Sequence, residues 1–215
     1  MRMKKRSVVL LTLGVILFVA LCYYFLFIRM VKVPTGSMKN TILPGDRLAI
    51  NLLGGEIRRG DIVMFNYPKD PSTRFVSRVI GLPGETIEVR KQRVYINGTE
   101  LGERRLLTKS QSPEDPAPLE AISSEGDGSY TVSYDAEEAA DTFGYEAGDF
   151  AVRAPFQIPA DNYFVMGDNR DNSLDSRFWG PLPRKLIVGK AFLIYWSEDR
   201  ASGKTRWSRM PSRLK

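Results

Sequence analysis

The residues best suited to chemistry stand in one short stretch, Pro34-Thr35-Gly36-Ser37-Met38. Ser37 offers a hydroxyl nucleophile, and Gly36 lets a substrate backbone approach it closely. The Thr35 hydroxyl and the Ser37 backbone N–H could together stabilise a developing oxyanion. The chain contains no histidine, which excludes a Ser-His-Asp mechanism, so the usual remaining activator is a lysine whose pKa is lowered by burial. Taken alone, the stretch is also typical of an ordinary turn.

An uncharged apolar segment precedes this stretch and sets its location. Residues 7–28 are 22 residues without a charge, and as a helix rising about 1.5 Å per residue they would extend roughly 33 Å, enough to cross a hydrocarbon core of about 30 Å. Four basic residues come before the segment and only Arg29 and Lys32 closely follow it. The positive-inside rule therefore places residues 1–6 in the cytoplasm and predicts a single-pass transmembrane anchor at residues 7–28.

A cleaved signal peptide is the alternative interpretation of the same segment. Its apolar region would be about 7–15 residues long and would end in a small-x-small site. The segment here is longer, and residues 28–32 offer no such site, which favours an uncleaved anchor. Ser37 follows nine residues after the span, and a chain of that length reaches at most about 30 Å. An enzyme held so close to a bilayer meets membrane-embedded substrates at a high effective concentration.

Charge is distributed unevenly along the chain. The net charge is +6, yet residues 111–149 hold eleven acidic residues and no basic one, so we interpret residues 103–149 as an acidic insertion, either a subdomain or a loop. Residues 200–215 hold six basic residues within a basic tail at 198–215. This tail could contact anionic lipid headgroups, bind nucleic acid or simply be frayed and solvated. Because an anchored chain meets lipid before nucleic acid, we expect a lipid bilayer and no nucleic acid among its partners.

The rest of the chain has the pattern of β structure. Short β-branched or aromatic runs separated by Gly, Pro, Asn and Asp predict strands. These runs lie at residues 47–51, 61–66, 74–80, 86–90, 94–96, 163–166 and 187–196. Asn97-Gly98 predicts a tight turn, and residues 130–134 could add a strand inside the acidic insertion. We therefore expect a mostly β fold, with an antiparallel β domain interrupted by the acidic insertion.

A second polar stretch, residues 167–180, concentrates Asp, Asn and Arg. A calcium-binding EF-hand loop starting at Asp168 would need Gly at its sixth position and Glu at its twelfth. Those positions are Ser173 and Trp179, so we reject a metal site of this kind. We expect most of the stretch to form Asx-turns tied together by Arg170 and Arg177, with one or two hydroxyls facing the active centre.

Three stretches together resemble the type I signal peptidases: residues 34–38, residues 78–85 (Arg-Val-Ile-Gly-Leu-Pro-Gly-Glu), and residues 167–180 continuing to 187–191. Their order, their spacing and the preceding apolar segment also match that family. The resemblance covers nearly the whole chain except the acidic insertion and the basic tail. It implies an antiparallel β catalytic domain at residues 29–102 and 150–197, which cleaves exported preproteins after small residues at positions −1 and −3. It also implies a Ser-Lys dyad and no cofactor.

The family's functional residues carry over to six positions of this chain. The resemblance makes Ser37 the nucleophile, places the oxyanion hole at the Ser37 N–H and the Thr35 hydroxyl, uses Ser173 to orient the base, uses Asp175 and Arg177 to support the site, and places Met38 at the floor of the small-residue pockets.

One position departs from the family pattern. The general-base lysine of the family stands immediately before Arg78, and here that residue is Ser77. A hydroxyl is far too weak a base to accept a proton near pH 7, although it could hold a water molecule in the vacated space. Losing general-base assistance typically costs about 10²–10⁴-fold in rate, while binding and an oxyanion hole still give residual catalysis. Another lysine could instead supply the base, and the candidates are Lys39, Lys69, Lys91 and Lys190.

Two functions from different classes follow. The first is a monomeric, membrane-bound serine endopeptidase on the outer face of a bacterial inner (plasma) membrane, which removes signal peptides from exported preproteins. The alternative is a catalytically impaired, signal-peptidase-like protein that binds the signal sequences of precursors. A self-cleaving repressor with Ser-Lys chemistry is disfavoured, because an apolar span and not a helix-turn-helix module precedes the β domain.

Overall fold

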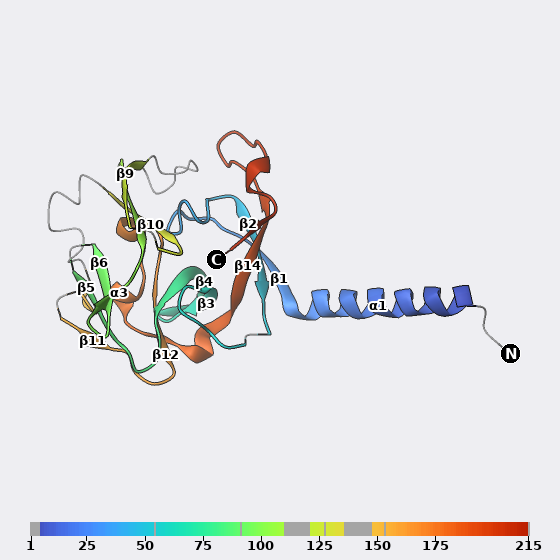
Figure 1. Ribbon diagram of the computed structural model, residues 1–215, viewed down its shortest axis with the longest axis horizontal. Coiled ribbons are helices and arrows are strands. Elements are labelled where there is room, and N and C mark those ends of the chain that lie inside the picture. The colour runs from blue at the N-terminus through green and yellow to red at the C-terminus, as the bar shows by residue number, and fades with distance from the viewer. Residues whose placement is uncertain are drawn as a thin grey trace.

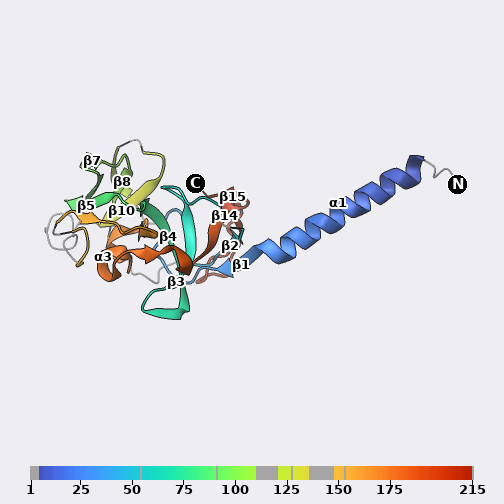
Figure 2. The same cartoon turned by 90° about the horizontal axis from the view of Figure 1, so that it is seen from below.

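The computed structural model describes residues 5–53, 55–90, 92–109, 121–126, 128–135, 148–152 and 154–214. A single long helix, α1 (Lys5–Phe27), projects away from a domain built of β-strands. Both views show the helix contacting the domain only at its C-terminal end, where it continues into β1 (Figures 1 and 2). Apolar side chains on α1 are exposed, including Leu10 at 70% and Phe18 at 67%. Within the described part of the chain, no helix combines the length and apolarity required to cross a membrane, so the anchor remains a prediction.

The main sheet has eight strands, and every pairing in it is antiparallel. Its order is β1-β2-β14-β3-β4-β12-β13, with β15 also paired to β14. The bounds are β1 Ile28–Lys32, β2 Asp46–Asn51, β3 Ile62–Tyr67, β4 Asp70–Gly81, β12 Asn162–Met166, β13 Leu182–Pro183, β14 Ile187–Ser197 and β15 Ser212–Arg213. The strands expected at residues 47–51, 61–66, 74–80, 163–166 and 187–196 are therefore confirmed.

Two smaller sheets lie beside the main one. The first has the order β11-β5-β6-β7, with bounds β5 Thr86–Arg90, β6 Arg93–Ile96, β7 Thr99–Glu100 and β11 Phe156–Gln157. Asn97 and Gly98 have φ values of +50° and +81° and form the two-residue turn between β6 and β7, as the Asn-Gly pair predicts. The second has the order β10-β8-β9, with bounds β8 Arg104–Thr108, β9 Ala121–Glu125 and β10 Thr131–Asp135.

The described residues of the acidic insertion form this second small sheet. The strand expected at residues 130–134 is present as β10, which pairs with β8 in parallel, unlike the strands of the main sheet. The backbone N–H of Ser133 donates to the Asp168 carbonyl at 2.8 Å, and the N–H of Asp135 donates to Asp171 Oδ2 at 2.6 Å. The sheet is thereby attached to the polar stretch 167–180. Residues 110–120 and 136–147, which carry most of the acidic side chains, lie outside the described residues.

The main sheet buries both of its faces. Along β3, Ile62 and Met64 pack into one apolar cluster with Met38, while Val63 and Phe65 pack into another on the opposite side. This alternation follows from the two-residue period of a strand, and it explains why β3 is apolar at consecutive positions. A third cluster fills the space between the main sheet and β5–β6, and it includes Ile80, Ile87, Val94 and Phe164. The apolar core therefore lies directly beneath the loops that carry the polar stretches.

The end of the chain is packed against the domain. β15 pairs with β14, the N–H of Leu214 donates to the Phe192 carbonyl at 3.1 Å, and Arg209 forms an ion pair with the buried Asp46 at 2.7 Å. The frayed, solvated tail that composition allows is therefore wrong for the described residues up to 214. A sheet-edge pairing and a buried carboxylate hold this segment, and neither partner is adjacent to it in sequence.

Candidate active site

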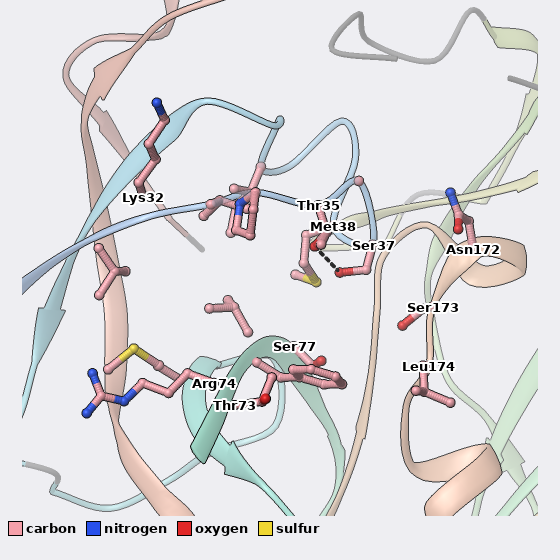
Figure 3. Close-up of a pocket in the computed structure, with 18 of the residues that line it drawn as sticks. Lys32, Thr35, Ser37, Met38, Thr73, Arg74, Ser77, Asn172, Ser173 and Leu174 are labelled. Atoms are coloured by element: carbon pink, nitrogen blue, oxygen red, sulfur yellow. Dashed lines mark hydrogen bonds between the residues drawn. The ribbon is translucent and has the colours of Figure 1, made fainter. Parts of the chain in front are cut away.

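A cavity of about 1050 Å³ opens beside the Pro34-Thr35-Gly36-Ser37-Met38 stretch. Its walls come from β1 and the loop that follows it, from β4, and from the segment 172–174. Ser37, Ser77 and Ser173 belong to three separate parts of the chain, and their side chains surround the same region of the cavity (Figure 3). The structure therefore brings together these three serines, which were candidate site residues on sequence grounds.

The loop carrying Ser37 is a tight turn seated on the core. The N–H of Lys39 donates to the Gly36 carbonyl at 3.0 Å, and the N–H of Ile42 donates to the Met38 carbonyl at 2.7 Å. Met38 is 1% exposed, packs in an apolar cluster beneath the turn and also lines the cavity. Met38 is buried, whereas the neighbouring Ser37 is partly exposed at the surface of the cavity.

The hydroxyls of Thr35 and Ser37 lie next to each other. Their Oγ atoms are 3.5 Å apart (Figure 3). In the described part of the chain, the Ser37 N–H has no hydrogen-bond acceptor. A backbone donor and a neighbouring hydroxyl are the groups that an oxyanion hole uses, so the turn has the composition expected for one.

The turn that carries Ser37 is held in place by residues 167–169. The backbone N–H of Asn169 donates to the Ser37 carbonyl at 3.0 Å, and its side-chain Nδ2 donates to the Gly36 carbonyl at 3.1 Å. Gly167 is packed so closely that a Cβ there would lie 2.5 Å from the Ser37 carbonyl oxygen and 2.3 Å from Ser173 Oγ. Only glycine fits without displacing Ser37 or Ser173. Sequence reasoning missed both residues, although they stand inside the polar stretch that it singled out.

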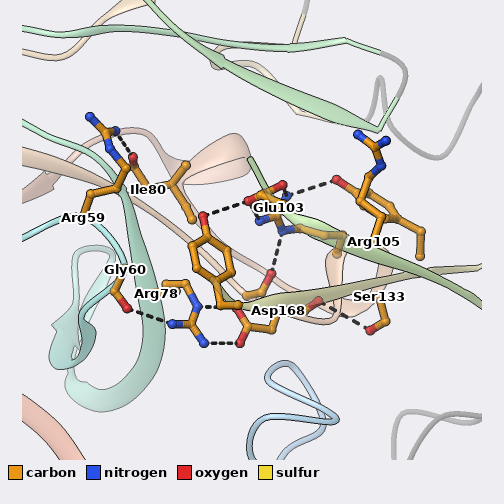
Figure 4. Close-up of polar contacts among 12 residues, drawn as sticks. Arg59, Gly60, Arg78, Ile80, Glu103, Arg105, Ser133 and Asp168 are labelled. Atoms are coloured by element: carbon orange, nitrogen blue, oxygen red, sulfur yellow. Dashed lines mark hydrogen bonds and ion pairs between the residues drawn. The ribbon is translucent and has the colours of Figure 1, made fainter. Parts of the chain in front are cut away.

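A fully buried ion pair joins this support to β4. Arg78 donates to the two Asp168 carboxylate oxygens at 2.8 and 2.7 Å, and its Nη1 donates to the Gly60 carbonyl at 2.8 Å (Figure 4). Thr41 Oγ1 also donates to Asp168 Oδ2, at 2.6 Å. Asp168 therefore links the loop that carries Ser37 to the strand that carries Ser77. Its role was not predicted individually, and the only signal for it was the density of Asp and Asn in residues 167–180.

Asp175 and Arg177 form a second buried pair. Arg177 Nε and Nη2 donate to the Asp175 oxygens, each at 2.8 Å. Asp175 Oδ2 also accepts from the Gly167 N–H at 3.0 Å, so the pair fixes the residue that packs against Ser37. Burial by itself would lower the pKa of Arg177, but the Asp175 carboxylate outweighs burial and the pKa is raised. The structure thus places Asp175 and Arg177 beside Gly167, and their supporting role stays a prediction.

Arg170 connects the site to the acidic insertion. It forms an ion pair with Glu103, and both side chains are almost completely buried. Its Nη1 donates to the Tyr134 hydroxyl at 3.0 Å, while the Tyr130 hydroxyl donates to Glu103 Oε1 at 3.0 Å (Figure 4). Burial raises the pKa of Tyr134 and, together with the Glu103 carboxylate, the pKa of Tyr130. Glu103 could not be found from sequence, because nothing there indicates its distant partner.

The structure constrains the search for a general base. Lys190 is held elsewhere by the Glu56 carbonyl at 3.0 Å and Asp61 at 3.2 Å. Lys39 is 1% exposed, and neither it nor Lys69 lines the cavity, whereas Lys91 lies outside the described residues. Lys32 is the one lysine among the described lining residues, and its ammonium points away from Ser37 (Figure 3). Ser77, 3% exposed, lines the same cavity as Ser37, and none of Lys39, Lys69 and Lys190 is among the lining residues that the structure describes.

Comparison with known proteins assigns this arrangement to a family. Residues 5–196 match the family described as "Signal peptidase, peptidase S26". The chain belongs to the S26 signal peptidases. It is a member of a family of serine proteases, and its mostly β architecture agrees with the expectation drawn from its motifs.

Several S26 relatives show how far the similarity extends. The Signal peptidase I of Pseudomonas aeruginosa is 31% identical over 226 residues, covering 91% of this chain and 75% of the relative. The Signal peptidase I of Leptolyngbya laminosa is 35% identical over 202 residues, covering 89% and 76%. A crystal structure of a signal peptidase I from Enterococcus faecalis is 25% identical, with a TM-score of 0.38, covering 64% of this chain and 97% of that chain.

Proposed function

We propose that this S26 member removes N-terminal signal peptides from exported preproteins, with Ser37 as the nucleophile. The observation that carries this proposal is the position of the Ser37 hydroxyl, 3.5 Å from the Thr35 hydroxyl, in the wall of a cavity of about 1050 Å³. A serine peptidase needs a hydroxyl that an extended peptide can reach, and donors for the oxyanion beside it. The turn and the cavity supply both.

The proposed reaction proceeds in two steps. Ser37 Oγ attacks the scissile carbonyl carbon, and the developing oxyanion accepts hydrogen bonds from the Ser37 N–H and the Thr35 hydroxyl. The C–N bond then breaks, the leaving amine takes up the proton lost from Ser37, and the signal peptide remains as an ester on Oγ until water hydrolyses it. A water molecule held by the Ser77 hydroxyl relays the proton, with Ser173 orienting it. Proton transfer through this relay is slower than proton transfer to a lysine, because neither a hydroxyl nor water is basic near pH 7.

We further propose that residues 7–28 anchor the chain in a bacterial inner membrane, with residues 1–6 in the cytoplasm and the β domain outside. Support comes from the 23-residue helix α1 and from its exposed apolar side chains, which project away from the domain. The basic residues before the apolar segment favour this orientation. Fractionation of cells that express the chain tests the anchor: recovery in the membrane after a carbonate wash is expected, and recovery in the soluble fraction would contradict it.

Cleavage specificity is proposed from the cavity floor. Met38 and Ile42 line the cavity beside Ser37 and pack in one apolar cluster, and we propose that they form pockets for small side chains at the −1 and −3 positions. The test is to incubate the detergent-solubilised chain with a preprotein and determine the new N-terminus by mass spectrometry. Cleavage after a small-x-small site, lost when the −1 residue becomes tryptophan, is expected. Cleavage elsewhere, or indifference to the −1 residue, would contradict it.

The alternative is a signal-peptidase-like protein that binds precursors and cleaves them poorly. The observation that favours it is Ser77, which stands where the resemblance implies a lysine. A precursor that binds the chain tightly but is not processed in excess enzyme would support this alternative over the peptidase.

A further inference from the structure

The charged residues around the active-site cavity are all of one sign. The described lining residues include three cations and no carboxylate, namely Lys32, Arg74 and Arg200. We call these three residues the cationic rim. Lys32 and Arg74 come from β1 and β4, and both lie toward the end of the cavity away from Ser173 and Leu174 (Figure 3). Two of the three cations of the rim, Lys32 and Arg74, therefore lie to one side of Ser37 (Figure 3).

These charges are not neutralised by ion pairs with the described residues. The side chains of Lys32 and Arg74 make no hydrogen bond or ion pair in the part of the chain that the structure describes, and both residues are exposed. Three acidic residues close in sequence to Arg74 or Arg200 are engaged elsewhere, and one of them, Glu198, pairs with Arg47 at 3.7 Å. Asp70 accepts from the Ser72 and Thr73 hydroxyls at 2.6 Å each, and Asp199 pairs with Arg206 at 3.2 Å.

Arg200 is fixed beside the nucleophile's loop. Its Nη1 donates to the Pro34 carbonyl at 2.9 Å, so the guanidinium is positioned although the residue is exposed. A cationic side chain that is already held in place loses less conformational freedom when it binds an anion than a mobile cationic side chain does. Arg200 therefore adds a directed positive charge to the rim.

We infer that the cationic rim selects substrates that carry an acidic residue near the scissile bond, on one side of it only. This inference rests on the proposed peptidase function. Ser37 fixes where the scissile carbonyl sits, and an extended peptide presents alternate side chains to the same wall, advancing about 3.3 Å per residue. An acidic side chain on the rim's side of the bond then meets unpaired cations, whereas one on the other side meets Ser173 and Leu174.

A peptide is the favoured occupant because the rim lines the same cavity as Ser37. A basic surface that serves anionic lipid needs only to face the bilayer and has no reason to share a cavity with the nucleophile. Each exposed ion pair changes an equilibrium by up to about five-fold, so the rim should bias substrate choice modestly. It should not decide alone whether cleavage occurs.

The test uses precursors that differ only by Glu or Gln at one position, scanned on both sides of the scissile bond. With full-length chain in uncharged detergent, we expect kcat/KM for Glu to exceed that for Gln by about 3–10-fold at positions on one side, and the ratio to decrease as salt screens the charges. Lys32→Gln should reduce the ratio, and Arg74→Glu should reduce it further, because it replaces one of the three cations by an anion. Lys185→Gln, at an exposed lysine of η2 (Arg184–Leu186) outside the cavity, should leave it unchanged.

Three results would overturn the inference. The first is a ratio near one at every position, and the second is a ratio that Arg74→Glu does not alter. The third is an effect of the rim variants that is equal for all substrates and present only in vesicles of anionic lipid, which would assign the rim to the membrane. Cleavage of the Gln precursors reports the proposed function separately. If none is cleaved, the same Glu-over-Gln preference in binding to the Ser37→Ala chain decides the question.

Discussion

The Asn169 backbone N–H donates to the carbonyl oxygen of Ser37 at 3.0 Å, and the Asn169 side chain donates to the Gly36 carbonyl at 3.1 Å. One residue therefore holds two carbonyls of the turn that carries Ser37. The Ser37 hydroxyl and N–H take no part in these two bonds and lie on the side of the turn that faces the cavity. A small displacement of a group near a reacting atom can lower the reaction rate substantially.

Asn169→Ala should reduce catalysis more than binding. It removes the side-chain bond to Gly36 while keeping the backbone bond to Ser37, so kcat should fall by about 2–10-fold, the equivalent of one neutral hydrogen bond. KM should change little, because Asn169 does not line the cavity. Steady-state kinetics on one precursor measure both values.

Asn162→Ala is the matched control for this experiment. Asn162 Nδ2 donates to the Ala160 carbonyl at 2.7 Å in an exposed turn, far in sequence from the nucleophile. It should keep the kcat of the unsubstituted chain. Equal losses from both substitutions would show that Asn169 has no special effect on Ser37.

Arg78→Met should destabilise the fold strongly. It leaves the Asp168 carboxylate, which is 0% exposed, buried without its cation, and breaking a buried pair from one side costs about 3–5 kcal/mol. Arg58→Met removes an ion pair whose side chains are each 75% exposed and should cost less than about 1 kcal/mol. Urea unfolding of the detergent-solubilised chain measures both. The double variant Arg78→Met/Asp168→Leu should lose less than the sum of the two single variants, and strict additivity would contradict the coupling.

Much of the β architecture could be predicted from the sequence, because strand signals are local. The runs that became β2, β3, β5, β6 and β14 each combine β-branched or aromatic residues with flanking turn residues. The Asn97-Gly98 turn was predictable for the same reason. The parallel pairing of β10 with β8 was not, since register and direction depend on partners far apart in sequence.

Some residues of the site could likewise be predicted from the sequence, and others could not. Ser37 and Thr35 were predicted from a local motif, and Met38, Ser77, Ser173, Asp175 and Arg177 from the family resemblance. Asn169 and Asp168 were missed as individuals because their partners, Ser37 and Arg78, are brought to them only by the fold. The insertion's attachment through Glu103 and Arg170, 67 positions apart, gives no signal in a single sequence.

Ser77→Lys should raise cleavage by at least about ten-fold, within the range of a general base. Ser77 is 3% exposed at a cavity wall shared with Met64 and Ile42, an apolar setting that lowers the pKa of a lysine. Ser77→Met adds a side chain of similar length without an amine and is the control. A gain in both variants, or in neither, would mean that the base lies elsewhere.

Alkaline solution should destabilise the folded chain through Tyr130. Its pKa is raised in the folded state by burial and by the Glu103 carboxylate, whereas in the unfolded chain it ionises near pH 10. Above about pH 10 the unfolded state therefore binds fewer protons than the folded state, so the free energy of unfolding falls as pH rises, by up to about 1.4 kcal/mol per pH unit. Below that pH the contribution is fully present.

Tyr130→Phe should flatten this alkaline decline, as measured by urea unfolding at a series of pH values. Tyr134 should still contribute, because burial raises its pKa as well. Tyr95→Phe, on β6 and outside the Glu103–Arg170 network, is the matched control and should keep the slope of the unsubstituted chain. Identical slopes for all three chains would contradict the assignment to Tyr130.

The most direct measurement is processing of one purified preprotein by the full-length chain and its serine variants, followed by intact mass. The unsubstituted chain should release the mature protein, Ser37→Ala should abolish release, and Ser208→Ala, at an exposed serine of η3 (Trp207–Arg209), should cleave at the original rate. Cleavage by Ser37→Ala at the rate of the unsubstituted chain would contradict the assignment of Ser37 as the nucleophile.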